Sequence, residues 1–238
     1  MGPDFQAGIK FKAPSNVKHI TFYLDFISPY AYLAFEALPQ ALTGLSYTVT
    51  YKPILFAALL NHHGQLGPAE IPVKRDWTYR QVMWLAQRQK TMLQMPAAHP
   101  FNPLGLLRLA VACKVPNRFV CETIFRHVWQ GGKDAADASR LADLEAILGP
   151  ELSANSDWAK ATLKSNTEAA IAEGVFGVPA FKVGDKLFWG LDALPMLREC
   201  LNGDAWFAGK GWADAAKVPV GQARRVGAVA ETGSKINS

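Results

Sequence analysis

The chain has 238 residues, of which half are hydrophobic and 19% are charged, a balance typical of a folded protein with a sizeable core. No apolar run approaches the roughly 18 residues that a membrane-spanning helix needs, so the sequence predicts no membrane partner. The net charge of +5 invites a nucleic-acid hypothesis, but the basic residues are scattered singly along predicted helices and no nucleic-acid-binding motif accompanies them. We therefore expect no nucleic-acid partner, while the mild positive charge would suit a small anionic ligand.

The first residues and the cysteines both indicate a cytoplasmic protein. Residues 1–17 carry an early acidic residue and lack the continuous apolar core of a secretory signal, so we predict a leader there. The three cysteines, Cys113, Cys121 and Cys200, cannot all pair with one another, and no CxxC motif occurs. Free thiols in a reducing compartment are the expected interpretation.

The first predicted elements form a strand–helix–strand unit. Residues 18–27, "KHITFYLDFI", predict a strand, and apolar residues at helical spacing predict a helix from Pro29 to Leu42. The alternation of "LSYTVTYKPI" predicts a second strand that stops near Pro53. Such a unit is typically parallel and right-handed.

Helical patterns follow for more than a hundred residues, and strand character then returns. The predicted helices cover residues 75–93, 104–114, 118–129, 138–149 and 157–173, after a short helix or loop in "FAALLNHHG". Two short strands at 177–190 flank Gly184-Asp185, a hairpin pattern, and "LDALPMLRECL" predicts a final helix. The tail after Gly203 shows no clear periodicity.

This order predicts an α/β protein with a thioredoxin-like fold and a helical domain inserted between its βαβ and ββα halves. We expect the thioredoxin-like domain to comprise residues 18–55 and 165–203, and the inserted helical domain to comprise residues 56–164. Residues 204–238 are predicted to form a C-terminal tail.

Ser28 and Pro29 stand where the first strand meets its helix, a natural ligand site in a βα unit. Serine is a typical N-cap and proline a typical first helical residue, so capping alone would explain the pair. A redox thioredoxin would place CxxC here, but this chain has Ser28-Pro29-Tyr30-Ala31, which cannot form a disulfide. A serine hydroxyl together with a helix N-terminus could instead stabilise a bound thiolate.

"DFISPYAYL", "EGVFGVPAF" and "FWGLD" occur in that order, and together they resemble the kappa-class glutathione transferases and 2-hydroxychromene-2-carboxylate isomerases. The resemblance covers roughly residues 18–203. It implies a cytoplasmic enzyme that uses glutathione, acts on a small aromatic molecule and forms a homodimer. By this resemblance, Ser28 would activate the glutathione sulfur, with Pro29 and Tyr30 beside it.

The same resemblance implies a set of glutathione contacts. Val178, before a cis Pro179, would pair through its backbone with the cysteinyl part, and Leu191 and Asp192 would meet the γ-glutamyl part. Asp192 could equally be a plain helix cap. Gln65 occupies the place of a glutathione-binding asparagine, and no metal ligand is expected. A lysine for a substrate carboxylate has no clear counterpart; Lys52 and Lys74 are substitutes in that region.

Other conspicuous residues have simpler interpretations. Asp25 would orient the turn before Ser28, and the adjacent pair of histidines at 62 and 63 is a poor metal site. His99 is expected to be a loop residue, with substrate contact as the alternative. The aromatic residues Trp77, Tyr79 and Trp84 are predicted to pack their helix.

The sequence therefore predicts a glutathione-dependent isomerase acting on 2-hydroxychromene-2-carboxylate or a similar aromatic catabolite. Two alternatives stay open. The first is a kappa-like glutathione transferase or peroxidase that uses the same site. The second is a non-catalytic thiol-binding relative that kept the fold and lost the redox pair.

Overall fold

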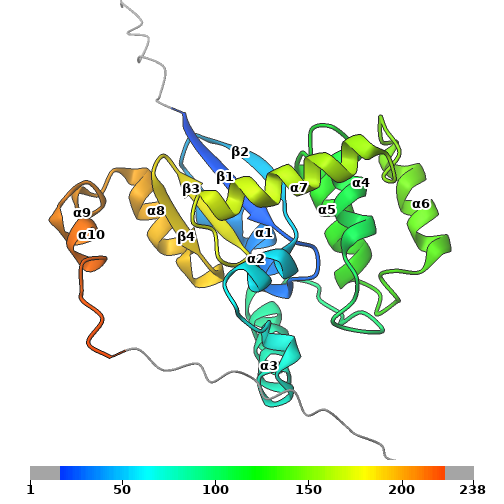
Figure 1. Ribbon diagram of the computed structural model, residues 1–238, viewed down its shortest axis with the longest axis horizontal. Coiled ribbons are helices and arrows are strands. Elements are labelled where there is room, and N and C mark those ends of the chain that lie inside the picture. Colours follow the sequence, from blue (N-terminus) through cyan, green and yellow to red (C-terminus); the bar gives the residue numbers. More distant parts are fainter. Residues whose placement is uncertain (1–16, 223–238) are drawn as a thin grey trace, which may run out of the picture. The chain divides into compact units, whose positions relative to one another are not determined.

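The computed structural model describes residues 17–222, in which a four-stranded sheet forms the centre (Figure 1). The strands are β1 (Lys18–Leu24), β2 (Tyr47–Pro53), β3 (Ala180–Val183) and β4 (Lys186–Trp189), in the order β2-β1-β3-β4. β2 runs parallel to β1, whereas β3 is antiparallel to both β1 and β4. The parallel start and the antiparallel hairpin are as predicted, so the thioredoxin-like fold is confirmed.

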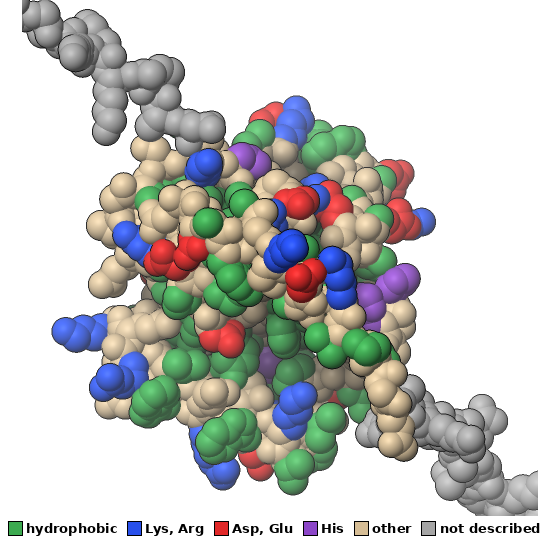
Figure 2. Space-filling view, turned by 90° about the vertical axis from the view of Figure 1, so that its left-hand side faces the viewer, with side chains coloured by type: hydrophobic (Ala, Val, Ile, Leu, Met, Phe, Trp, Pro, Cys, Tyr) green, Lys and Arg blue, Asp and Glu red, His purple; other side chains and the backbone are tan. Residues whose placement is uncertain are grey.

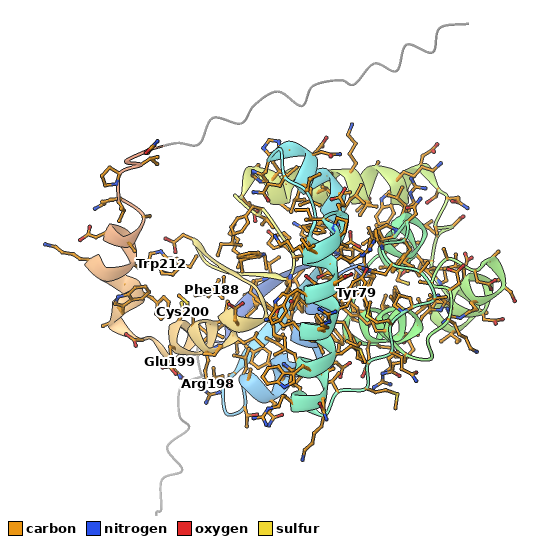
Figure 3. The ribbon with its side chains drawn as sticks, turned by 90° about the horizontal axis from the view of Figure 1, so that it is seen from below. Tyr79, Phe188, Arg198, Glu199, Cys200 and Trp212 are labelled. Atoms are coloured by element: carbon orange, nitrogen blue, oxygen red, sulfur yellow. The ribbon has the colours of Figure 1, made fainter. Side chains whose placement is uncertain are left out.

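Helices cover both faces of the sheet. The helices of the chain up to residue 202 are α1 (Pro29–Ala41), α2 (Phe56–His62), α3 (Pro72–Gln89), α4 (Leu104–Ala112), α5 (Arg118–Trp129), α6 (Ala138–Leu148), α7 (Asp157–Ala172) and α8 (Leu194–Asn202), with 3-10 turns η1 (Pro68–Glu70) and η2 (Leu191–Ala193). α1 packs against α8, and Arg198 of α8 (labelled in Figure 3) donates to the Ala41 carbonyl at the end of α1. α7 lies across the other face (Figure 1).

The core explains why β1 occupies the middle of the sheet. Its apolar side chains are buried on both faces, as expected for a strand covered on either side. Phe22 packs on Phe181, with ring centroids 4.5 Å apart. On the opposite face, Tyr23 joins a buried cluster made of Ile54, Leu59, Ala170, Val175, Val178 and Ala180. This cluster fixes the end of β1 against the segment that leads into β3.

The elements α2 to α6 lie between β2 and α7 in the chain, where the helical insertion is predicted. The chain up to Asn202 forms one compact unit, and the chain from Gly203 forms a second. The proposed division at residues 56–164 and 165–203 stays a prediction. The predicted leader lies outside the described residues except for Val17, and the tail is described only as far as residue 222.

Three details differ from the sequence expectations. α3 ends at Gln89, because Lys90 takes up a left-handed conformation that terminates the helix before the predicted residue 93. Trp77 and Trp84 are 62% and 58% exposed, so the prediction that they pack their helix is wrong. The second unit contains two short helices, α9 (Ala205–Ala208) and α10 (Lys210–Ala215), which are too short to produce a readable period.

The distribution of charged side chains and the state of the cysteines agree with the expectations from the sequence. Figure 2 shows Lys and Arg side chains interspersed with acidic and apolar ones on the face that it presents. Within residues 17–222, no helix is both long enough and apolar enough to cross a membrane. All three cysteines are free thiols, as predicted, and burial raises the pKa of each.

Candidate functional site

Ser28 forms the N-cap of α1, and Pro29 follows as the first helical residue. The Ser28 Oγ accepts a hydrogen bond from the Ala31 N–H at 3.2 Å, while the residue keeps 7% of its surface exposed. Capping uses a lone pair of the hydroxyl and leaves its proton available. Ser28 can therefore cap α1 and donate a hydrogen bond to a bound atom at the same time.

The first turn of α1 has a further free donor. Pro29 has no N–H, the Ala31 N–H is capped by Ser28, and the Tyr32 N–H bonds to the Ser28 carbonyl at 3.2 Å. The Tyr30 N–H has no hydrogen-bond partner among residues 17–222. Together with the positive end of a thirteen-residue helix, these donors favour an anionic atom beside Ser28.

Asp25 holds the turn formed by residues 25–28, called the Ser28 turn below, through hydrogen bonds from backbone N–H groups. The carboxylate is fully buried and accepts from the Ile27 N–H at 3.1 Å through Oδ1 and from the Phe56 N–H at 2.9 Å through Oδ2. It thus joins the turn to the start of α2, and its predicted role in orienting the turn is confirmed. Burial raises the pKa of Asp25 to about 7, although the backbone donors oppose that change.

Two aromatic side chains contact the same turn from the helical segment, the part of the chain between β2 and α7. The Trp129 indole N–H donates to the Phe26 carbonyl at 3.0 Å, and His99 Nε2 lies 2.8 Å from the Ile27 carbonyl. Tyr79 in turn hydrogen-bonds to His99. His99 is therefore more than a loop residue, because its side chain is bound to the residue that precedes Ser28.

The Val178–Pro179 peptide is cis, as the resemblance implies. β3 begins at Ala180 opposite Tyr23, so continuing this antiparallel register places Val178 beside Asp25, close to the Ser28 turn. The backbone N–H and C=O of Val178 have no partner within residues 17–222, whereas the Pro179 carbonyl accepts from Gly190 at 2.9 Å. The Val178 backbone thus offers one donor and one acceptor to an extended ligand.

Asp192 lies in η2, which packs against α1. Burial raises the pKa of Tyr30, and the Asp192 carboxylate raises it further. Gly190 makes room for this carboxylate: its φ is +101°, and an added Cβ would lie 2.3 Å from Asp192 Oδ1. The carbonyl of Leu191 accepts from the Leu194 N–H within the same turn.

The structure brings Ser28, Pro29, Tyr30, Val178 and Asp192 to one end of the sheet, but other predicted residues lie apart. Gln65 is exposed and is held through its backbone N–H by the Leu60 carbonyl. Lys52 lies over the Tyr23 ring, 5.9 Å from its centroid, and Lys74 is exposed on α3. The described contacts of these three residues do not include Ser28.

Sequence reasoning missed the residue that faces Tyr30. The Tyr30 hydroxyl donates to Gln81 Oε1 of α3 at 2.6 Å, which brings α3 beside the start of α1. Gln81 stands on a polar helix face with no pattern to distinguish it. The histidine pair is exposed with its rings nearly perpendicular, and residues 17–222 contain no metal-binding cluster of three or more acidic, histidine or cysteine side chains.

The fold and this site define a thioredoxin-like protein with a serine–proline turn in place of a redox pair. A profile described as DSBA-like thioredoxin domain matches residues 19–202, and the chain belongs to this family. It is 28% identical to "Glutathione s-transferase kappa 2" of Caenorhabditis elegans over 208 residues, which cover 78% of this chain and 92% of the relative. It is also 28% identical to the 2-hydroxychromene-2-carboxylate isomerase of Pseudomonas putida, with 77% and 94% covered.

The comparison of structures gives the same relationship. A solved 2-hydroxychromene-2-carboxylate isomerase superposes on this chain with a TM-score of 0.67 at 25% identity. The match covers 84% of this chain and all of that structure. The relatives are thus named as isomerases and as kappa-class glutathione transferases, which are two different enzyme activities.

Proposed function

We propose that the protein is a glutathione-dependent isomerase acting on 2-hydroxychromene-2-carboxylate or a similar aromatic catabolite. The observation that carries the proposal is the position of Ser28. Its hydroxyl caps α1 by accepting from Ala31 and keeps its proton for a sulfur atom at the positive end of the helix. The Tyr30 N–H, in the same first turn of α1, has no hydrogen-bond partner within residues 17–222 and is a second donor for that sulfur.

The residues present fit a tripeptide thiol. Ser28 and the α1 N-terminus suit the thiolate, and the unpartnered backbone groups of Val178 suit the peptide part in an extended conformation. The Asp192 carboxylate, for which Gly190 leaves room, suits the ammonium group of the γ-glutamyl part. Leu191 lies beside it, and Gln65 remains a proposed contact at the rim.

When bound, glutathione supplies a nucleophilic sulfur that adds to the substrate, allows rotation about the substrate bond that isomerises, and is then released unchanged. Ser28 holds that sulfur as thiolate by hydrogen bonding, and the α1 dipole favours the same charge. A drop of one to two pKa units from a value near 8.5 makes thiolate a major species at pH 7, at about 1.4 kcal/mol per unit. Asp25 fixes the turn without touching the sulfur.

The assay for this proposal uses purified protein with 2-hydroxychromene-2-carboxylate, followed by ultraviolet absorbance. We expect conversion that requires glutathione and leaves the glutathione concentration unchanged. Conversion at the uncatalysed rate, with glutathione bound, would reject the isomerase assignment. Under that outcome the protein would be a transferase or a non-catalytic thiol-binding relative.

Kappa-like transfer or peroxide reduction is the second candidate, and the positions of the lysines favour it. A substrate carboxylate would be expected to meet a cation, but Lys52 lies over Tyr23 and Lys74 is exposed on α3. A neutral electrophile needs no such partner. Conjugation of an aryl halide without activity on the chromene would support this candidate.

Asp192 is expected to determine glutathione affinity. Because a hydrogen bond between charged groups contributes about 1.5–3 kcal/mol, Asp192→Asn should weaken binding about tenfold or more in calorimetry. Gly190→Ala should have a similar effect, because its Cβ would displace the carboxylate. Asp185→Asn, in the exposed β3–β4 turn, is the control and should bind like the wild type. If Asp192→Asn also binds normally, Asp192 is only a cap.

We also propose a homodimer, in a reducing compartment such as the cytoplasm that suits glutathione and free thiols. Val73, Trp77 and Trp84 lie on one side of α3 by helical spacing and are 80%, 62% and 58% exposed. Trp77→Ser combined with Trp84→Ser should convert the dimer to a monomer in light scattering. Trp158→Ser, at a residue 44% exposed on α7, should not. A monomeric wild type at micromolar concentration would exclude the dimer.

A further inference from the structure

The two peptide carbonyls before Ser28 are both bound from the helical segment. Phe26 accepts from the Trp129 indole, 103 residues away in the chain, and Ile27 accepts from His99, 72 residues away. A carbonyl oxygen carries partial negative charge, so one that turned toward the α1 N-terminus would oppose an anion there. These two donors keep both oxygens directed at the helical segment.

The contact with Ile27 defines the tautomer of His99. Because a carbonyl can only accept, Nε2 carries the proton and donates to Ile27 at 2.8 Å. Burial holds the pKa of His99 below its usual range, which favours the neutral ring, and in the neutral ring with a proton on Nε2 the Nδ1 atom is an acceptor. The Tyr79 hydroxyl, which has one proton to donate, lies 2.7 Å from Nδ1 and 2.8 Å from the His99 carbonyl, so these two acceptors share that proton. Tyr79 thereby stabilises the tautomer that Ile27 requires.

Ring packing fixes the orientation of this imidazole. The His99 ring centroid lies 5.4 Å from that of Tyr79, 5.5 Å from that of Trp129 and 6.1 Å from that of Phe101. Tyr79 belongs to α3 (labelled in Figure 3) and Trp129 to α5, so two helices hold the ring. This packing leaves the imidazole little freedom to move, so its Nε2–H stays directed at the Ile27 carbonyl.

We propose that His99, oriented by Tyr79, is a positioning residue that fixes the Ser28 turn in its thiolate-stabilising conformation. This proposal rests on the proposed function, in which the turn receives the glutathione sulfur. His99 acts through Ile27, and no contact between His99 and the reacting atoms is required. Removing its donor leaves the Ile27 carbonyl without a partner and free to rotate toward the sulfur.

The test compares His99→Phe, His99→Gln and Tyr79→Phe. His99→Phe keeps an aromatic ring but loses the donor, whereas the His99→Gln amide can still donate to Ile27. The control is His127→Phe, because His127 Nε2 also bonds to a backbone carbonyl, that of Ala135 at 3.0 Å, away from the Ser28 turn. Thermal unfolding of each variant establishes that it is folded.

Three measurements are made on each variant. In glutathione-free protein, hydrogen exchange of the Ala31 and Tyr32 amides, which bond to Ser28, should accelerate several-fold in His99→Phe and less in Tyr79→Phe. With glutathione, the pKa of the bound thiol, from thiolate absorbance, should rise by about half a unit or more, and turnover should fall about tenfold. Glutathione affinity at a pH where the thiol is protonated should stay within about twofold. His99→Gln should recover much of each effect, and His127→Phe should resemble the wild type.

Two results would overturn the proposal. One is unchanged amide exchange and thiol pKa in folded His99→Phe. The other is an equal change in His127→Phe, which would indicate a general loss of stability. If the wild type binds no glutathione, the proposed function fails instead. The exchange measurement then still decides whether His99 fixes the turn.

Discussion

Replacement of Ser28 with alanine is expected to lower glutathione-dependent turnover by about a hundredfold or more. Removing one donor that stabilises a developing or bound anion costs about 10²–10³ in rate in a preorganised site. The pKa of the bound thiol should rise by about one to two units, because the hydroxyl hydrogen bond to the thiolate is lost. Absorbance of the thiolate across a pH titration measures this shift independently of substrate.

Ser28 also caps α1, so its removal should destabilise the protein by about 1 kcal/mol. Ser156 provides a matched control, since it caps α7 and accepts from the Ala159 N–H at 3.2 Å, the same distance as at Ser28. Ser156→Ala should lose comparable stability in urea unfolding and keep full turnover. Equal losses of turnover in the two variants would show that Ser28 is only a cap.

The site divides into residues that local sequence predicts and residues that only tertiary structure reveals. Ser28 and Pro29 are recognisable because a cap and a first-turn proline lie next to each other at the end of a strand. The hairpin is recognisable from Gly184-Asp185 between two β-rich runs. These features depend on neighbours in the chain, which the sequence displays directly.

The support of the turn depends on distant contacts. His99 and Trp129 bind carbonyls of the Ser28 turn that lie 72 and 103 residues away in the chain. No local sequence pattern indicates which carbonyls they bind. Helical spacing alone also could not distinguish Trp77 and Trp84, which are exposed, from buried residues such as Val82. Which side of a helix faces the core is decided by the elements that pack on it.

Asp25 is expected to make the stability of the protein depend on pH, and Asp25→Asn should remove that dependence. The pKa of Asp25 is about 7 in the folded protein, against an ordinary value of 3.8. The folded state therefore binds the proton more tightly than the unfolded chain. This contribution to stability is fully present below about pH 4 and is lost as pH rises to about 7.

The size of the effect follows from the difference in pKa. About three units at about 1.4 kcal/mol each give roughly 4 kcal/mol as an upper bound. Asp25→Asn should be less stable at pH 4.5 by about 1–3 kcal/mol, because one of the Ile27 and Phe56 N–H groups then faces an amide NH₂. The stability advantage of the wild type should shrink, or reverse, as pH rises to 7.5.

Urea unfolding of both proteins between pH 4.5 and 7.5 measures this difference. The exposed Asp185 is the control, because hydrogen bonding to Lys186 lowers its pKa. A lowered pKa gives a contribution that is lost only as pH falls through the folded value, so Asp185→Asn should show a constant difference across this range. A constant difference for Asp25→Asn as well would mean that the backbone donors of Ile27 and Phe56 keep Asp25 ionised throughout. The buried carboxylate would then be a permanent negative charge bound to the Ser28 turn. The α1 dipole and the Ser28 hydroxyl would have to stabilise a thiolate against repulsion from that charge.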